Sequence, residues 1–241
     1  MNFSYYGGYY SSYYGASYIL VIIGALLCLI TSGMVKGTFA KYAKVASRLG
    51  MTGAEVAQAI LHKSGIYDVT VQRVAGSLTD NFNPGTKTVN LSESVYDSSS
   101  ISAISVAAHE CGHAMQHDES YFPLSVRSSI LPVANFGSKF GLWIVLAGVF
   151  ISFFQPLIFI GVLLFSFGVL FQIVTLPVEF DASKRALATL SDMGYLSDDE
   201  MDGARKVLKS AAMTYVASAA ASILSLIRLI LIAQGGRRRR D

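Results

Sequence analysis

The chain has 241 residues, of which 52% are hydrophobic and only 15% are charged. Soluble domains carry about 25% charged residues, so this balance indicates a membrane protein. The formal net charge of +3 is too small to favour nucleic acid as a partner, and the two cysteines provide neither a disulfide framework nor a CxxC metal knuckle.

The first segment is rich in Tyr, Gly and Ser and carries no charge over residues 1–17. We expect it to be flexible or to lie at the membrane interface, where tyrosine rings are favoured. Residues 18–35 form an apolar run with no basic segment before it and no clear cleavage site after it. This pattern predicts a retained transmembrane helix rather than a signal peptide.

Residues 36–130 have a mixed composition and are expected to form the first part of a small α+β domain. Capping and turn residues mark its elements, because Thr52 and Glu55 form a capping-box pattern and an Asn-Pro-Gly turn lies between two alternating runs. The expected elements are a helix over 52–65, strands over 67–74 and 87–92, and a helix over 98–117 capped by one of its serines.

The second half of the chain is strongly apolar, with one polar interruption. Two apolar runs within 134–176 are joined only by Gln155, so they predict a helical hairpin that enters the membrane and returns to the same side. The remaining expected segments are a polar helical block over 177–211, a fourth transmembrane helix over 212–234 and a basic tail over 235–241.

Basic residues predict the orientation of these helices. Lysine and arginine are absent from the first 35 residues, but they are frequent directly afterwards and again in 177–211. The positive-inside rule therefore places both polar segments in the cytoplasm. The run Arg237–Arg240 fits less well, because four complete crossings would put it outside. Either the last helix does not cross the membrane fully, or the larger number of basic residues in the earlier segments determines the orientation.

The sequence HECGH at 109–113 contains two histidines four positions apart. In a helix His109 and His113 share one face, about 6 Å apart along the axis, so both imidazoles can bind one zinc ion. Glu110 lies beside the first ligand, where its carboxylate can take a proton from a water made acidic by zinc. The alternative is an ordinary helix that matches this short motif by chance, and a third ligand would decide between the two.

Catalytic zinc takes three protein ligands and leaves one position open. Glu179 is the preferred third ligand, because it follows a hairpin that returns to the side of the motif and because Pro177 is suited to begin a helix. Asp181 is the alternative ligand, or a partner that orients a ligand histidine. Both carboxylates could instead stabilise only the start of a helix.

Other potential ligands near the motif are not expected to bind the metal. His117 lies about 12 Å from His109 along the helix axis, which is too far for one tetrahedral ion. Cys111 points away from the two histidines and is expected to pack in the core. His62 is expected to lie at the surface.

The combined motifs resemble a known family, the YugP-type membrane neutral zinc metallopeptidases of bacteria. The resemblance covers nearly the whole chain from about residue 18, and it rests on four runs: VNLSE at 89–93, AAHECGHAMQ at 107–116, TLPVEFDASKRAL at 175–187 and AAMTYVA at 211–217. It implies a mainly α, polytopic membrane protein with about four transmembrane helices and a small α+β zincin-like catalytic domain that carries HExxH on a helix. It also implies a bacterial cell membrane as the location.

The resemblance implies Zn²⁺ as the cofactor, with His109, His113 and Glu179 as ligands and Glu110 as general base. The family is similar in turn to integral-membrane proteases of the heat-shock and prenyl-protein processing clan, in which an aspartate follows the ligand glutamate by four residues. Ser183 occupies that position here. We therefore expect Asp181 to take over the role of that aspartate.

In such proteases an edge strand beside the active-site helix pairs with extended substrate. The resemblance implies this role for the strand that contains Thr88, Val89, Asn90 and Leu91, and a plain structural hairpin is the alternative. Tyr215 and Arg205 are candidates for stabilising a developing oxyanion.

These observations predict a membrane-embedded zinc endopeptidase whose partners are a peptide or protein substrate and the lipid bilayer. A catalytically silent membrane scaffold or chaperone that retains the motif is the main alternative. A transporter is less consistent with the sequence, because apart from Arg228 the apolar runs lack the ionisable groups that usually mark a pathway.

Overall fold

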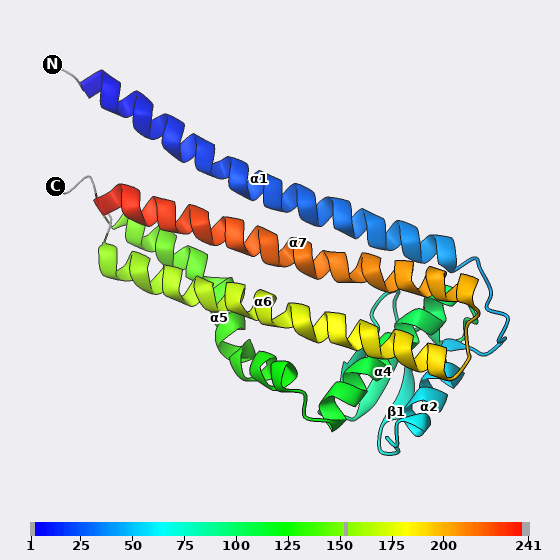
Figure 1. The fold of residues 1–241 in the computed structure, drawn as a ribbon. Coiled ribbons are helices and arrows are strands. Elements are labelled where there is room, and N and C mark those ends of the chain that lie inside the picture. The colour runs from blue at the N-terminus through cyan, green and yellow to red at the C-terminus, as the bar shows by residue number, and fades with distance from the viewer. Residues whose placement is uncertain (1–2, 152–153, 238–241) are drawn as a thin grey trace. The chain divides into compact units, whose positions relative to one another are not determined.

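The computed structural model describes residues 3–151 and 154–237 (Figure 1). Most of these residues are helical, and residues 70–92 contain the strands of a small sheet. The helices are α1 (Phe3–Tyr42), α2 (Gly53–Lys63), α3 (Glu93–Tyr96), α4 (Ile101–Asp118), α5 (Phe122–Phe150), α6 (Gln155–Asp192) and α7 (Asp198–Arg237). The strands are β1 (Thr70–Val74), β2 (Asn81–Asn83) and β3 (Thr88–Ser92).

In the described ranges four helices are long and apolar enough to cross a membrane: α1, α5, α6 and α7. Each contains an 18-residue stretch of high mean hydropathy within a helix of at least 26 residues, which is long enough to cross a bilayer. The chain is therefore a mainly α, polytopic membrane protein, as predicted, and its sheet has a third strand, β2, beyond the two that were expected.

Helices α1 and α6 extend beyond the apolar runs on which they were predicted. Residues 3–17, expected to be flexible, belong to α1 in the structure. The apolar run and the polar block on either side of Pro177 form one helix, α6, so the expectation that Pro177 begins a helix is wrong. A proline inside a helix loses one backbone hydrogen bond, but membrane helices tolerate it when neighbouring groups satisfy the freed carbonyl. The tail residues 238–241 and residues 1–2 lie outside the described residues.

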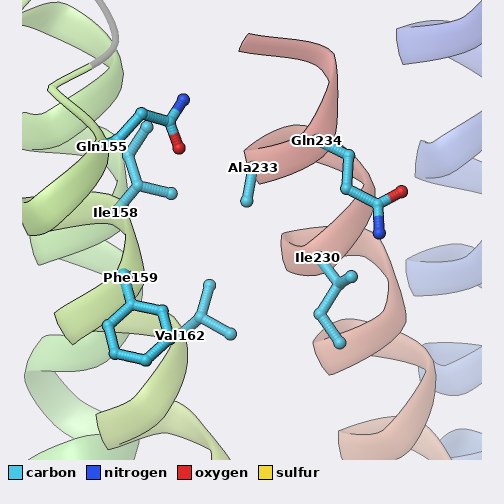
Figure 2. A pocket seen from close by; sticks show the side chains of 7 residues that line it. All are labelled: Gln155, Ile158, Phe159, Val162, Ile230, Ala233 and Gln234. Carbon is cyan, nitrogen blue, oxygen red and sulfur yellow. The ribbon is translucent and has the colours of Figure 1, made fainter. Parts of the chain in front are cut away.

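The chain divides into two compact units. The membrane unit comprises residues 1–31, 126–175 and 215–241, and the α+β unit comprises residues 32–125 and 176–214. Within the membrane unit, glycines allow α5 and α6 to approach closely, since a Cβ at Gly141 would lie 3.0 Å from the carbonyl oxygen of Gly161. A cavity of about 260 Å³ lies between α6 and α7, with Gln155 and Ile158 opposite Ala233 and Gln234 (Figure 2).

The α+β unit contains the larger hydrophobic core, in which α2 and α4 pack with the sheet. Local signals start these helices as expected. The Thr52 hydroxyl accepts from the Glu55 amide while the Glu55 carboxylate accepts from the Thr52 amide, which completes the capping box of α2. The hydroxyl of Ser100 caps α4 by accepting from the Ala103 amide. The Ser100 cap fixes the start of the helix that carries the HExxH motif.

The sheet has the strand order β1-β3-β2, with β1 parallel and β2 antiparallel to β3. The expectation that residues 88–91 form an edge strand is therefore wrong, because β3 is the central strand and is hydrogen-bonded on both sides. The reason is local: residues 81–83 fold back across the Asn-Pro-Gly turn and cover the second side of β3, pairing Phe82 with Val89. The free edges belong to β1 and β2.

Candidate metal centre

Helix α4 presents the HExxH motif toward α6. The two helices approach closely at Gly112, where an added Cβ would lie 2.5 Å from the carbonyl oxygen of Ala182. Only glycine fits such a contact without moving one backbone. Because Gly112 lies between His109 and His113 in the sequence, this contact brings both imidazoles to the part of α6 that carries Glu179.

Three potential ligand atoms converge at this contact. Nε2 of His109 lies 3.3 Å and Nε2 of His113 lies 3.5 Å from Oε2 of Glu179. All three ligand atoms lie within 4.8 Å of one another. Atoms bound to a tetrahedral zinc at about 2.0–2.1 Å lie about 3.4 Å apart. Two imidazoles and one carboxylate are also a donor set that zinc prefers, so the residues present fit this ion.

The side chain of Gln116 orients His113. Its amide nitrogen donates to the Val178 carbonyl oxygen at 2.7 Å and to Oδ2 of Asp181 at 2.9 Å. Its amide oxygen must then face Nδ1 of His113, 3.0 Å away. Nδ1 therefore carries the proton and donates it to Gln116, which leaves the lone pair of Nε2 directed toward Glu179.

Asp181 supports this arrangement without joining the cluster. Its Oδ2 accepts from Gln116 and from Nε of Arg185 at 2.6 Å, and Arg185 also pairs with Glu119 at 2.8 Å. Of the two carboxylates that the sequence offered as third ligand, the structure thus brings Glu179 to both histidines and Asp181 to Gln116. Asp181 acts on His113 through that glutamine.

Ser183 takes the position beside the other histidine. Its hydroxyl lies 3.2 Å from Nδ1 of His109. The hydroxyl can accept the Nδ1 proton and so hold the ring with Nε2 toward Glu179. Ser183 therefore contacts one of the two histidines of the cluster.

Glu110 lies beside the cluster and is only 7% exposed. Desolvation by burial raises the pKa of its carboxyl, and the nearby charges of Glu179 and Asp80 raise it further, against a lowering effect of the two histidines. A general base is most effective when its pKa approaches the working pH, and burial shifts the pKa of Glu110 in that direction. For His113, desolvation lowers the pKa, but the Glu179 and Glu110 carboxylates and the hydrogen bond with Gln116 together more than offset it, so the net shift is upward.

Asp80, just before β2, is held close to this site by the start of α3. Its two carboxylate oxygens accept from the Ser92 amide at 2.7 Å and from the Ser92 hydroxyl at 3.1 Å. Burial raises the pKa of Asp80 in spite of these hydrogen bonds. The structure therefore adds a half-buried carboxyl group, that of Asp80, to the surroundings of Glu110.

The other residues that the sequence offered are not part of the histidine–histidine–glutamate cluster. Arg205 is exposed and pairs with Asp202 at 2.9 Å, and Tyr215 belongs to the membrane unit as a half-buried residue of α7. As expected, Cys111 is buried in the core and His62 is exposed. His117 is exposed near the end of α4, where its ring centroid lies 5.7 Å from that of Phe82 in β2. This contact places the free edge strand beside the HExxH helix.

Three residues around the cluster, Gln116, Ser183 and Asp80, were not predicted as part of the site. Gln116 lies three positions after His113, which is the spacing of neighbours on one helix face, so that signal was available. Ser183 was noticed only as a departure from the clan pattern. Asp80 lies in a polar turn region where nothing distinguishes it from other loop carboxylates.

Fold and site together describe a polytopic membrane protein with a histidine–histidine–glutamate cluster on two packed helices. The chain belongs to the family described as "Putative neutral zinc metallopeptidase", whose profile matches residues 17–234. It is 47% identical over 221 residues to "Putative membrane protease YugP" of Bacillus subtilis (strain 168), and the alignment covers 91% of this chain and 98% of that protein. The family resemblance found in the sequence is thereby confirmed. No solved structure matches the chain.

Proposed function

We propose that the protein is a membrane-embedded zinc endopeptidase that hydrolyses peptide bonds of membrane-associated or misfolded proteins. The observation that carries the proposal is the convergence of His109, His113 and Glu179 beside the buried Glu110. Membership of a family named for zinc metallopeptidases supports it. The concentration of lysine and arginine in the two polar segments supports a site that faces the cytoplasm.

The proposed chemistry assigns one role to each residue. His109, His113 and Glu179 would hold Zn²⁺, which when bound supplies a Lewis acid for the peptide carbonyl and for a water molecule. The Glu110 carboxylate takes a proton from the attacking water and delivers it to the leaving amine nitrogen. Gln116 and Ser183 hold the Nδ1 protons of the two imidazoles, so that both rings keep Nε2 directed at the cation.

For substrate we propose strand addition at β2 in place of β3. Backbone groups of Asn81–Asn83 pair with β3 on one side, which leaves the other side of β2 as a free edge. Phe82 contacts His117 of α4, so this edge runs beside the helix that carries Glu110. An extended peptide paired there would gain backbone hydrogen bonds that do not depend on its sequence. The enzyme would therefore accept many peptide sequences, as the cleavage of misfolded proteins requires.

The test separates an enzyme from a silent scaffold. Purified Glu110→Gln should retain the wild-type zinc content but lose at least about 10²-fold in the rate of casein cleavage, the usual contribution of a general base. Glu93→Gln is a control, because that carboxylate is exposed and pairs with the surface residue Arg73. Wild-type cleavage in the Glu110 variant would refute the proposal.

The metal ligands are tested by metal analysis. Glu179→Gln should lower the zinc content of the purified protein, since it removes the one carboxylate that reaches both histidines. Asp181→Asn should keep the metal, because Asp181 contacts Gln116 and Arg185 instead. The opposite pattern would make Asp181 the third ligand.

A further inference from the structure

A groove away from the metal centre lies within the α+β unit, between the last turns of α1 and the first turns of α7. It has a volume of about 280 Å³. Met34 and Lys41 line it from one face of α1, and Lys206, Lys209 and Met213 line it from one face of α7. Spacings of seven residues, and of three and four, place these side chains on matching faces of two helices. We call this feature the lysine groove.

The lysine groove concentrates positive charge. Lys41, Lys206 and Lys209 are all exposed, and in the described part of the chain no carboxylate oxygen lies within 4.0 Å of their ammonium groups. Three like charges around one groove repel one another, and none of the residues that line the groove is acidic. The lining is therefore complementary to an anion.

Its two ends differ in polarity. Met34 lies at the end of the apolar run 18–35, and Met213 lies at the start of the apolar run 212–234. Lys41 and Lys206 lie seven residues farther from those runs, which is about 10 Å along each helix. The lysine groove thus begins at the apolar part of two membrane helices and ends among cations.

The walls of the lysine groove are fixed by packing. Gly203 on α7 contacts the ring of Tyr42, and a Cβ at that glycine would lie 2.9 Å from Cε1 of the ring. Just beyond α1, the Arg48 amide donates to the Glu200 carboxylate at 2.7 Å. These contacts hold the end of α1 against the start of α7, so the groove is formed before any ligand arrives.

From this arrangement we infer that the lysine groove binds one anionic phospholipid, with its phosphate between Lys41, Lys206 and Lys209 and its acyl chains along Met34 and Met213. Cationic side chains next to a membrane helix bind anionic headgroups, and each contributes about fivefold to binding. The methionines provide an adaptable apolar surface for the chains. The site shares no residue with the metal centre and does not depend on the proposed peptidase activity.

The experiment measures lipid retained by the full-length protein. Native mass spectrometry is carried out on protein purified from micelles that contain equal amounts of phosphatidylglycerol and phosphatidylcholine. The wild-type protein should retain more phosphatidylglycerol than phosphatidylcholine. The triple variant K41Q/K206Q/K209Q should retain at least tenfold less phosphatidylglycerol than the wild type. K36Q/K44Q/K63Q removes the same charge from exposed lysines outside the groove and should retain the lipid as wild type does.

Further arms distinguish the possible ligands. K41R/K206R/K209R keeps the charge and should keep the lipid, which separates lost binding from misfolding. Equal retention of the two lipids by wild type, or equal loss in the control variant, would overturn the inference. Displacement of phosphatidylglycerol by equimolar inorganic phosphate or by an acidic peptide would also overturn it, in favour of a site for that ligand.

Discussion

Gln116 offers the sharpest test of how the candidate metal centre is held. Its side chain is fully buried and links His113 to two acceptors on α6, Val178 and Asp181. We predict that Gln116→Leu, which keeps the volume but removes the amide, weakens zinc binding by about 10–100-fold, the usual effect of losing a partner that orients a ligand histidine. This corresponds to roughly 1.4–2.8 kcal/mol.

The same change should also destabilise the metal-free protein. Asp181 keeps its bond to Arg185, so the uncompensated losses are the Val178 carbonyl contact and the His113 contact. Each hydrogen bond contributes about 0.5–1.5 kcal/mol, so losing both should lower the free energy of unfolding by about 1–3 kcal/mol. Zinc affinity is measured by competition with a chromogenic chelator, and stability by thermal unfolding of the chelator-treated protein.

A matched control exists in the chain. Gln58 and His62 also form a glutamine–histidine contact, at 2.7 Å, but on the exposed surface of α2. Gln58→Leu should change neither zinc affinity nor stability by more than a few tenths of a kcal/mol. A Gln116→Leu variant with zinc affinity within twofold of wild type would refute the argument that this amide sets the tautomer of His113.

Two further predictions concern packing and pH. Gly112→Ala should lower the free energy of unfolding by about 1–3 kcal/mol or more, because its Cβ would meet the Ala182 carbonyl oxygen. Gly37→Ala has open space around the new Cβ and should be neutral or slightly stabilising. Thermal unfolding in detergent compares the two variants. Asp80→Asn should flatten the dependence of stability on pH. The folded pKa of Asp80 is raised by burial, so its contribution is greatest below the unfolded pKa of about 3.9 and falls as pH rises through the folded value. The difference in melting temperature, wild type minus Asp80→Asn, should therefore decrease between pH 3.5 and 7, and an increase would contradict the prediction.

Local features of the fold were predictable because they depend on neighbours in sequence. The capping box at Thr52, the HExxH spacing and the apolar runs each act over a few residues, and the structure contains the helices they predict. The central position of β3 was not predictable in the same way. Its partner β2 has only three residues, Asn81–Asn83, and too short a polar–apolar alternation to be recognised as a strand.

The site shows the same division between local and distant information. His109, Glu110 and His113 are defined by one helical turn, so the motif could be interpreted without a fold. Glu179 is 70 residues away from His109, and its choice over Asp181 depended on a hairpin argument and on a wrong premise about Pro177. In the continuous helix α6, residues two positions apart point in different directions, which is why only one of the two carboxylates reaches the histidines.

Packing and metal binding are linked in this arrangement, since the same groups serve both. Gln116 joins α4 to the backbone of α6 and also orients His113, while the Gly112–Ala182 contact sets the distance that Glu179 must span. A cation bound by both helices therefore stabilises their contact, by about 4 kcal/mol when its concentration is 1,000 times its dissociation constant. Conversely, if His109, His113 and Glu179 hold zinc as proposed, any substitution that separates α4 from α6 should weaken zinc binding even when all three side chains remain. The candidate metal centre is thus a property of the helix pair, and losses of zinc in variants have to be compared with their stability before a residue is assigned as a ligand.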